Sequence, residues 1–124
     1  MVTAEQHRLQ AEHNKAFFQS FDLDTSPYLD WVVTATFYSA LHLVEWFLKA
    51  KGVVSRRDHH LRDAYIARIS ELRSIYPDYT ELKFQSEAAR YECARFTPEI
   101  VKKDLLPRLA RLESHIKTLL SASS

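Results

Sequence analysis

The stretch at residues 26–52, SPYLDWVVTATFYSALHLVEWFLKAKG, decides the fold class of this chain. Its apolar side chains recur around most of a helical circumference, which is typical of a helix at the centre of a bundle. Ser26 as the cap and Pro27 as the first helical residue predict where this helix begins. Gly52 follows a basic last turn and predicts a left-handed stop. We therefore expect one long central helix.

Two ionisable residues inside this stretch, His42 and Glu45, bear on a different interpretation, that of a membrane span. Each of these side chains is expensive to place in lipid, and the apolar run is barely long enough to cross a bilayer. We expect the helix to lie in a protein core and the chain to have no membrane partner.

Four further helices are predicted around the central one, at about residues 3–20, from 55 or 58 to 76, at 79–96 and at 98–119. Thr3 and Gln6 form a capping-box signature, and Thr97 with Pro98 is a cap followed by a first helical residue. Pro77 predicts the end of the third helix. Pro107 either kinks the last helix or lies in the first turn of a second segment capped by Asp104.

The flanking helices carry recognisable apolar faces. That of the first helix is thin, and that of the fourth has small residues in its middle, among them the single cysteine, which we expect to be a small buried side chain. The first face comprises Leu9, Ala16, Phe17 and Phe21, and the second comprises Leu82, Ser86, Ala89, Cys93 and Phe96. Short connections between long helices predict antiparallel neighbours.

Composition agrees with this architecture. The chain has 124 residues, of which 46% are apolar, and it contains 17 basic and 16 acidic residues. That length fits one domain, residues 1–124, and one glycine is too few for the tight turns of a strand-rich fold. A lone cysteine favours a reducing compartment, and the first ten residues do not resemble a signal peptide. We expect a cytoplasmic, all-α antiparallel bundle of about five helices.

Three blocks of residues carry a resemblance to a known family. The first is Asp30-Trp31 followed by the segment 37–42, FYSALH; the second is His60 with Arg62; the third is Tyr79 and Leu82 followed by the segment 86–91, SEAARY. In this order and on these helices, they resemble bacterial HEPN-like domains over roughly residues 5–120. The resemblance implies a helical bundle that pairs as a homodimer. Many HEPN proteins are metal-independent ribonucleases of toxin–antitoxin, defence or RNA-processing systems, and others are non-catalytic modules.

The chain departs from the family at the catalytic motif. Active members carry an arginine followed, after four to six residues, by a histidine, whereas Arg90 is followed by YECARF without a histidine. Ribonuclease activity of the standard type is therefore doubtful. The resemblance and the residue types together give these candidates for binding RNA or another ligand: Arg90, Tyr91, His60, Arg62, His42 and Tyr38.

Each candidate has a structural alternative. A polar stripe on the central helix, made of Asp30, Thr34, Tyr38, His42, Glu45 and Lys49, either lines a ligand groove or is a solvated face with a Glu45–Lys49 link. The basic cluster at residues 56–62 either binds phosphate at a helix start or is an exposed loop. Arg90 either holds phosphate or pairs with Asp30 or Glu45.

We expect no metal site, because the adjacent His59 and His60 point about a hundred degrees apart on a helix. We also expect no cofactor. The sequence thus favours a dimeric HEPN-like module associated with RNA or with an antitoxin-like protein. A non-catalytic protein–protein interaction domain is the alternative, and a small-molecule-binding bundle is a third interpretation.

Overall fold

A computed structural model describes residues 2–53 and 59–122, apart from the side chains of residues 59–61 and 122. Within this part the chain forms helices and no strand, which confirms the predicted all-α bundle. The elements are α1 (Ala4–Gln19), α2 (Leu29–Ala50), α3 (His59–Arg68), the 3₁₀ helix η1 (Ser70–Ile75), α4 (Tyr76–Tyr91), α5 (Pro98–Ile100), the π-helical turn η2 (Val101–Leu105) and α6 (Leu106–Ala122).

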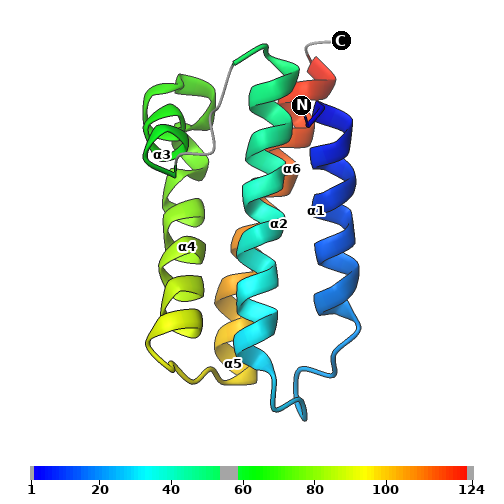
Figure 1. The fold of residues 1–124 in the computed structure, drawn as a ribbon, viewed down its shortest axis with the longest axis vertical. Helices are drawn as coiled ribbons and strands as arrows, with labels where there is room; N and C mark the ends of the chain where they lie inside the picture. The colour runs from blue at the N-terminus through cyan, green and yellow to red at the C-terminus, as the bar shows by residue number, and fades with distance from the viewer. Residues whose placement is uncertain (1, 54–58, 123–124) are drawn as a thin grey trace.

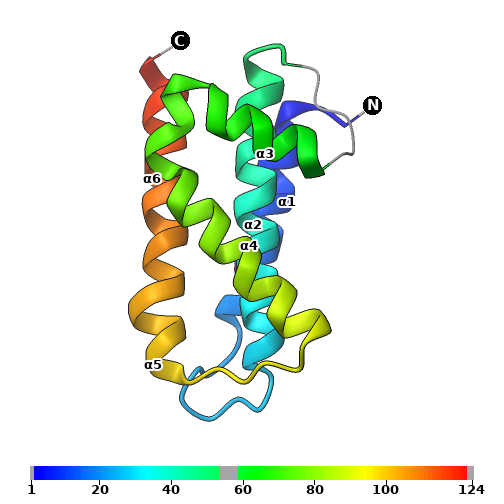
Figure 2. The ribbon, with the colours of Figure 1, turned by 90° about the vertical axis from the view of Figure 1, so that its left-hand side faces the viewer.

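The central position of α2 is confirmed. Helices α1 and α4 lie on either side of α2 and run antiparallel to it, while α6 lies behind (Figure 1). Helix α3 lies across the bundle near the C-terminal end of α2 (Figure 2). The core is built largely from α2, whose Val32, Leu43, Val44 and Leu48 are fully buried. None of the helices in the described part of the chain combines the length and apolarity that a bilayer span requires.

The apolar face of α1 differs from the predicted one. The capping box of Thr3 and Gln6 is present, but Leu9 and Phe17 are about half exposed. The buried positions of α1 are instead His7, Ala11 and Phe18. The sequence interpretation failed because it selected large apolar residues, whereas α1 approaches α2 closely through a small alanine and a histidine.

The predicted starts of α4 and α2 differ from those in the structure. Pro77 does not end the third helix but lies in the first turn of α4, where its missing N–H would have no intrahelical partner. Helix α3 already ends at Arg68. Helix α2 begins at Leu29, and the side chain of its N-cap residue, Tyr28, makes no capping hydrogen bond. The Ser26 hydroxyl instead accepts a hydrogen bond from the Tyr28 N–H at 3.0 Å. The predicted third-helix starts at residues 55 and 58 lie outside the described residues.

The last helical run begins as predicted. Thr97 caps it, its Oγ1 accepting from the Ile100 N–H at 3.2 Å, and Pro98 is the first helical residue. Pro107 lies in the first turn of α6, as one of the two alternatives had it. Asp104 does not act as the proposed cap with its side chain, which accepts from the Arg108 guanidinium at 3.0 Å.

Helix α4 is shorter than predicted, which overturns the expectation for Cys93. The helix ends at Tyr91, and the Ala94 N–H donates to the Ala88 carbonyl at 3.2 Å. This bond closes a Schellman-type ending in which Cys93 occupies the left-handed position with φ +54°. Cys93 is therefore exposed, not buried on the apolar column. Gly52 occupies the same kind of position after α2, with φ +76°, as predicted.

Candidate functional site

Four side chains from three helices form one polar group, here called the His42 cluster: His7 of α1, His42 and Glu45 of α2, and Arg62 of α3. The Nδ1 atoms of His7 and His42 are 3.0 Å apart, and the two ring centroids are separated by 5.2 Å. The Arg62 Nε donates to a Glu45 carboxylate oxygen at 2.6 Å. Since residues three and four apart share a helix face, α2 presents His42 and Glu45 together to α1 and α3.

Burial sets the protonation of the two histidines. Desolvation, with smaller contributions from His7 and from the Arg62 charge, lowers the pKa of His42 to about 4. The pKa of His7 is also lowered, chiefly by burial, against the opposing influence of Glu45. Both rings are therefore neutral near pH 7, and one Nδ1–H donates to the other Nδ1.

Glu45 and Arg62 form a buried ion pair between α2 and α3. Glu45 is 3% exposed and Arg62 is 7% exposed. Their hydrogen bond raises the pKa of Arg62 against the effect of burial. This pair corrects two expectations. Glu45 belongs to the buried interior and not to a solvated stripe, and its partner is Arg62 and not Arg90.

The second polar group, the Arg90 cluster, consists of Tyr38 of α2 and Ser86, Arg90 and Tyr91 of α4. The Arg90 Nη1 donates to the Tyr38 hydroxyl at 2.7 Å, and Nη2 and Nε donate to the Ser86 Oγ and carbonyl at 3.1 and 3.2 Å. The guanidinium carbon lies 5.3 Å from the ring centroid of Tyr38 and 5.0 Å from that of Tyr91. Arg90 therefore pairs with neither Asp30 nor Glu45, and it lies between two tyrosine rings.

The structure divides the predicted site residues between these two groups. His42 and Arg62 belong to the His42 cluster, and Tyr38, Arg90 and Tyr91 belong to the Arg90 cluster. Within the described part of the chain, every hydrogen bond of the Arg90 side chain goes to Tyr38 or Ser86, and none goes to a histidine. The His60 side chain and residues 56 and 57 of the basic cluster lie outside the described residues.

A shallow groove between α1 and α2 connects the two clusters. It consists of two adjoining hollows of about 770 and 400 Å³ that share Gln10, His13 and His42. We call it the α1–α2 groove, and its further lining residues are Val2, Gln6, His7, Leu9, Asn14, Phe17, Trp31, Thr34, Ala35 and Tyr38. None of these residues is Lys, Arg, Asp or Glu, so the groove has no formal charge when its histidines are neutral.

Sequence reasoning missed most of this groove. His7 was overlooked, although its spacing from Ala11 and Phe18 places it on the buried face of α1. Trp31 belongs to the apolar side chains that predicted a central helix, but it is 55% exposed at the edge of the groove. The available signal was the repeat of histidine and amide residues on α1, at His7, Gln10, His13 and Asn14.

The described residues contain no group of three or more His, Cys, Asp or Glu side chains arranged to hold a metal ion. No family model, no curated protein and no solved structure matches this chain.

Proposed function

We propose that this protein is a HEPN-like helical module that forms a homodimer through the α1–α2 groove and does not act as a metal-independent ribonuclease. The observation that carries the proposal is the groove itself, with Phe17 and Trp31 half exposed on an uncharged surface. Large exposed apolar side chains mark interaction surfaces, and the cores of such interfaces are depleted of charge.

A second copy of the chain suits this groove. The surface offers both projecting side chains, Trp31 and Phe17, and the hollows beside them, so one patch can be complementary to itself under two-fold symmetry. Tryptophan and tyrosine at the centre of an interface contribute a large share of the binding energy. The HEPN resemblance of the chain independently implies a homodimer.

The experiment is light scattering of the full chain at high micromolar concentration, together with the Trp31→Glu and Phe17→Glu variants. We expect a dimer for the parent chain and monomers for both variants. Phe84→Glu is the matched control, because Phe84 is 60% exposed on α4 and does not line the groove. A monomeric parent chain, or a Phe84 variant that dissociates as readily as the Trp31 variant, contradicts the proposal.

The proposal excludes standard catalysis for a chemical reason. Cleavage of RNA without metal needs a group that accepts a proton from the 2′-hydroxyl or gives one to the leaving oxygen. Arg90 is too basic to exchange a proton, and the neutral His42 has its Nδ1 engaged with His7. We expect no cleavage of single-stranded RNA in the presence of a chelator. Cleavage that disappears in both Arg90→Ala and one His→Ala variant refutes this part.

RNA binding without cleavage is the second candidate, favoured by the Arg90 cluster. Tyr91 is 74% exposed and stacks near a guanidinium, an arrangement that suits an unpaired base and its phosphate. The protein would then act in a cytoplasmic toxin–antitoxin, defence or RNA-handling system, and an antitoxin-like protein would be a further partner. Fluorescence anisotropy with single-stranded RNA tests it. Binding weakened by Tyr91→Ala and by added salt supports it, and affinity unchanged by Tyr91→Ala contradicts it.

A further inference from the structure

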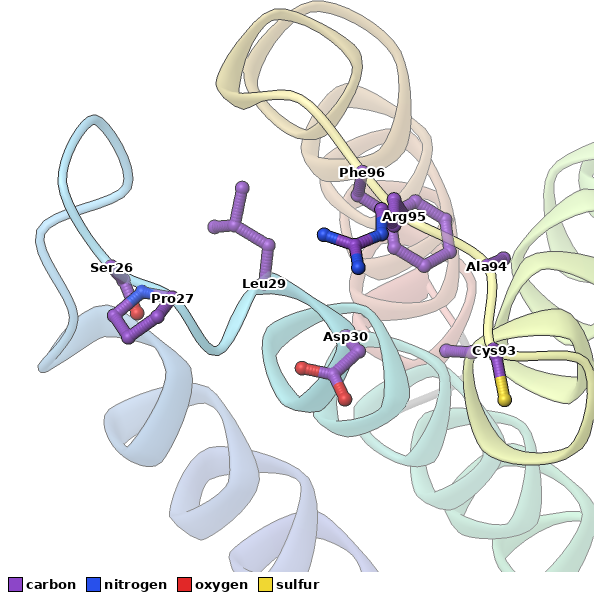
Figure 3. A pocket seen from close by; sticks show the side chains of 9 residues that line it. Ser26, Pro27, Leu29, Asp30, Cys93, Ala94, Arg95 and Phe96 are labelled. Atoms are coloured by element: carbon purple, nitrogen blue, oxygen red, sulfur yellow. The ribbon is translucent and has the colours of Figure 1, made fainter.

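A separate pocket lies at the end of the bundle where the segment before α2 faces the segment after α4 (Figure 3). Its volume is about 520 Å³, within the usual range of small-molecule sites. Ser26, Pro27, Leu29 and Asp30 line one side of it, and the segment 93–96 lines the other. It shares no lining residue with the α1–α2 groove.

Two side chains of opposite charge line this pocket and do not form an ion pair with each other. Asp30 is half-buried in the first turn of α2, and Arg95 extends from the loop after α4 toward α2 (Figure 3). Among the described residues, neither the Asp30 carboxylate nor the Arg95 guanidinium forms an ion pair or a side-chain hydrogen bond. The nearby Asp24 is different, because Lys102 neutralises it at 2.7 Å. The pocket therefore holds an anion and a cation that are both available to a ligand.

The rest of the pocket supplies an apolar wall and free backbone donors. Leu29 is 7% exposed, and Phe96 packs against the core beside it. The side chain of Tyr28 does not cap α2, and among the described residues the N–H groups of Leu29 and Asp30 have no hydrogen-bond partner, whereas those of Trp31 and Val32 donate to the Tyr28 carbonyl. An uncapped helix start of this kind favours a carboxylate, and Arg95 can reinforce it with a bidentate contact.

We propose that this pocket binds a small zwitterion, namely an α-amino acid with an apolar side chain. The ligand's ammonium group pairs with Asp30, and its carboxylate pairs with Arg95 and the start of α2. Its side chain packs against Leu29 and Phe96. Ligands with one charge are disfavoured, because a simple anion faces Asp30 and a simple cation faces Arg95.

Calorimetric titration of the full chain with three matched ligands tests this assignment. Leucine carries both charges, leucinamide only the ammonium group, and N-acetylleucine only the carboxylate. We expect leucine to bind at least about tenfold more tightly than either analogue, since each analogue loses one charge-assisted contact. Valine and phenylalanine extend the series to smaller and larger apolar side chains.

Two variants assign the contacts. Asp30→Asn should weaken the binding of leucine by about tenfold and should reduce the difference in affinity between leucine and N-acetylleucine. Arg95→Gln should reduce the difference in affinity between leucine and leucinamide. Glu87→Gln and Arg73→Gln are matched controls at exposed positions outside the pocket and should bind like the parent chain. Circular dichroism of all four variants tests whether each of them folds.

Several results overturn the proposal. One is the absence of binding by leucine, valine and phenylalanine up to about 10 mM. Another is binding that Asp30→Asn and Arg95→Gln leave unchanged. A third is leucinamide or N-acetylleucine binding as tightly as leucine.

Discussion

The two ends of α2 carry similar polar side chains in very different environments. At the C-terminal end, Glu45 is 3% exposed and paired with Arg62, and His42 is hydrogen-bonded to His7. At the N-terminal end, Asp30 lines an open pocket and has no partner among the described side chains. The difference teaches that position on a helix stripe does not determine function. The neighbouring elements determine it: α1 and α3 cover His42 and Glu45, whereas the loop before α2, the loop after α4 and Ala89 of α4 leave an open pocket beside Asp30.

The buried end should be the more sensitive to substitution. Arg62→Ala leaves the Glu45 carboxylate buried without its ion-pair partner, and such losses typically destabilise by about 3–5 kcal/mol. Urea unfolding measures the change in the free energy of unfolding. Lys102→Ala is the control, because its exposed pair with Asp24 should contribute less than about 1 kcal/mol. Equal losses in the two variants would remove the distinction between the ends of α2.

The histidine pair predicts a pH dependence at the same end. The pKa of His42 is about 4 in the folded chain, below its ordinary value near 6.5, so the unfolded chain binds protons more readily between these values. The contribution of His42 to the free energy of unfolding is therefore fully present above about pH 6.5, is lost progressively as the pH falls toward 4, and changes no further below it. His7 acts in the same direction, because its pKa is also lowered.

Urea unfolding at a series of pH values isolates this contribution when the parent chain is compared with His42→Gln. The difference between the two should shrink on acidification, because the variant lacks the proton-binding group. The exposed His13 provides the control, and His13→Gln should follow the parent chain. Parallel curves for the parent chain and His42→Gln would contradict the assignment of neutral, partly buried rings.

The Arg90 cluster lies between the two extremes and should show an intermediate effect. Tyr38→Phe removes the acceptor of the Arg90 Nη1 hydrogen bond, and because both side chains are partly exposed we expect a loss of about 1 kcal/mol. Tyr91→Phe is a matched control, since the ring contact with Arg90 remains and no hydrogen bond is lost. Thermal or urea unfolding should separate the two variants, and indistinguishable stabilities would show that the Tyr38 bond contributes nothing.

The features predicted correctly from the sequence depend on local rules. The Thr3 capping box, the Gly52 stop and the Thr97-Pro98 start each involve residues within a few positions of one another. The periodicity of α2 likewise shows its central place without knowledge of its neighbours. Local hydrogen bonding and backbone sterics therefore determine the elements of this fold and most of their ends.

The site was predictable only in part, because its pairings join distant segments. Arg90 could not be matched to Tyr38, 52 residues away, because the register between α4 and α2 depends on side-chain packing. The same holds for His7 and His42, which are 35 residues apart. Cys93 was misplaced for a different reason: α4 ends two residues before it, and the usual glycine signal for such an ending is missing.

The smallest expected effect concerns that ending, which supports the open pocket at the N-terminal end of α2. Cys93 adopts φ +54°, a conformation that costs a side-chain-bearing residue about 1–2 kcal/mol relative to glycine. Cys93 is exposed, so Cys93→Gly loses little packing, although glycine adds entropy to the unfolded chain. We expect a net stabilisation of about 0.5–1 kcal/mol in urea unfolding.

Gly52→Ala is the converse test: it introduces a side chain at φ +76° where no atom lies within 4 Å of the new Cβ, so conformational strain alone should destabilise by about 1 kcal/mol. Opposite signs for these two substitutions would show that both helix endings obey the same backbone rule. A destabilised Cys93→Gly variant would instead mean that the thiol side chain contributes to the pocket wall beyond its backbone conformation.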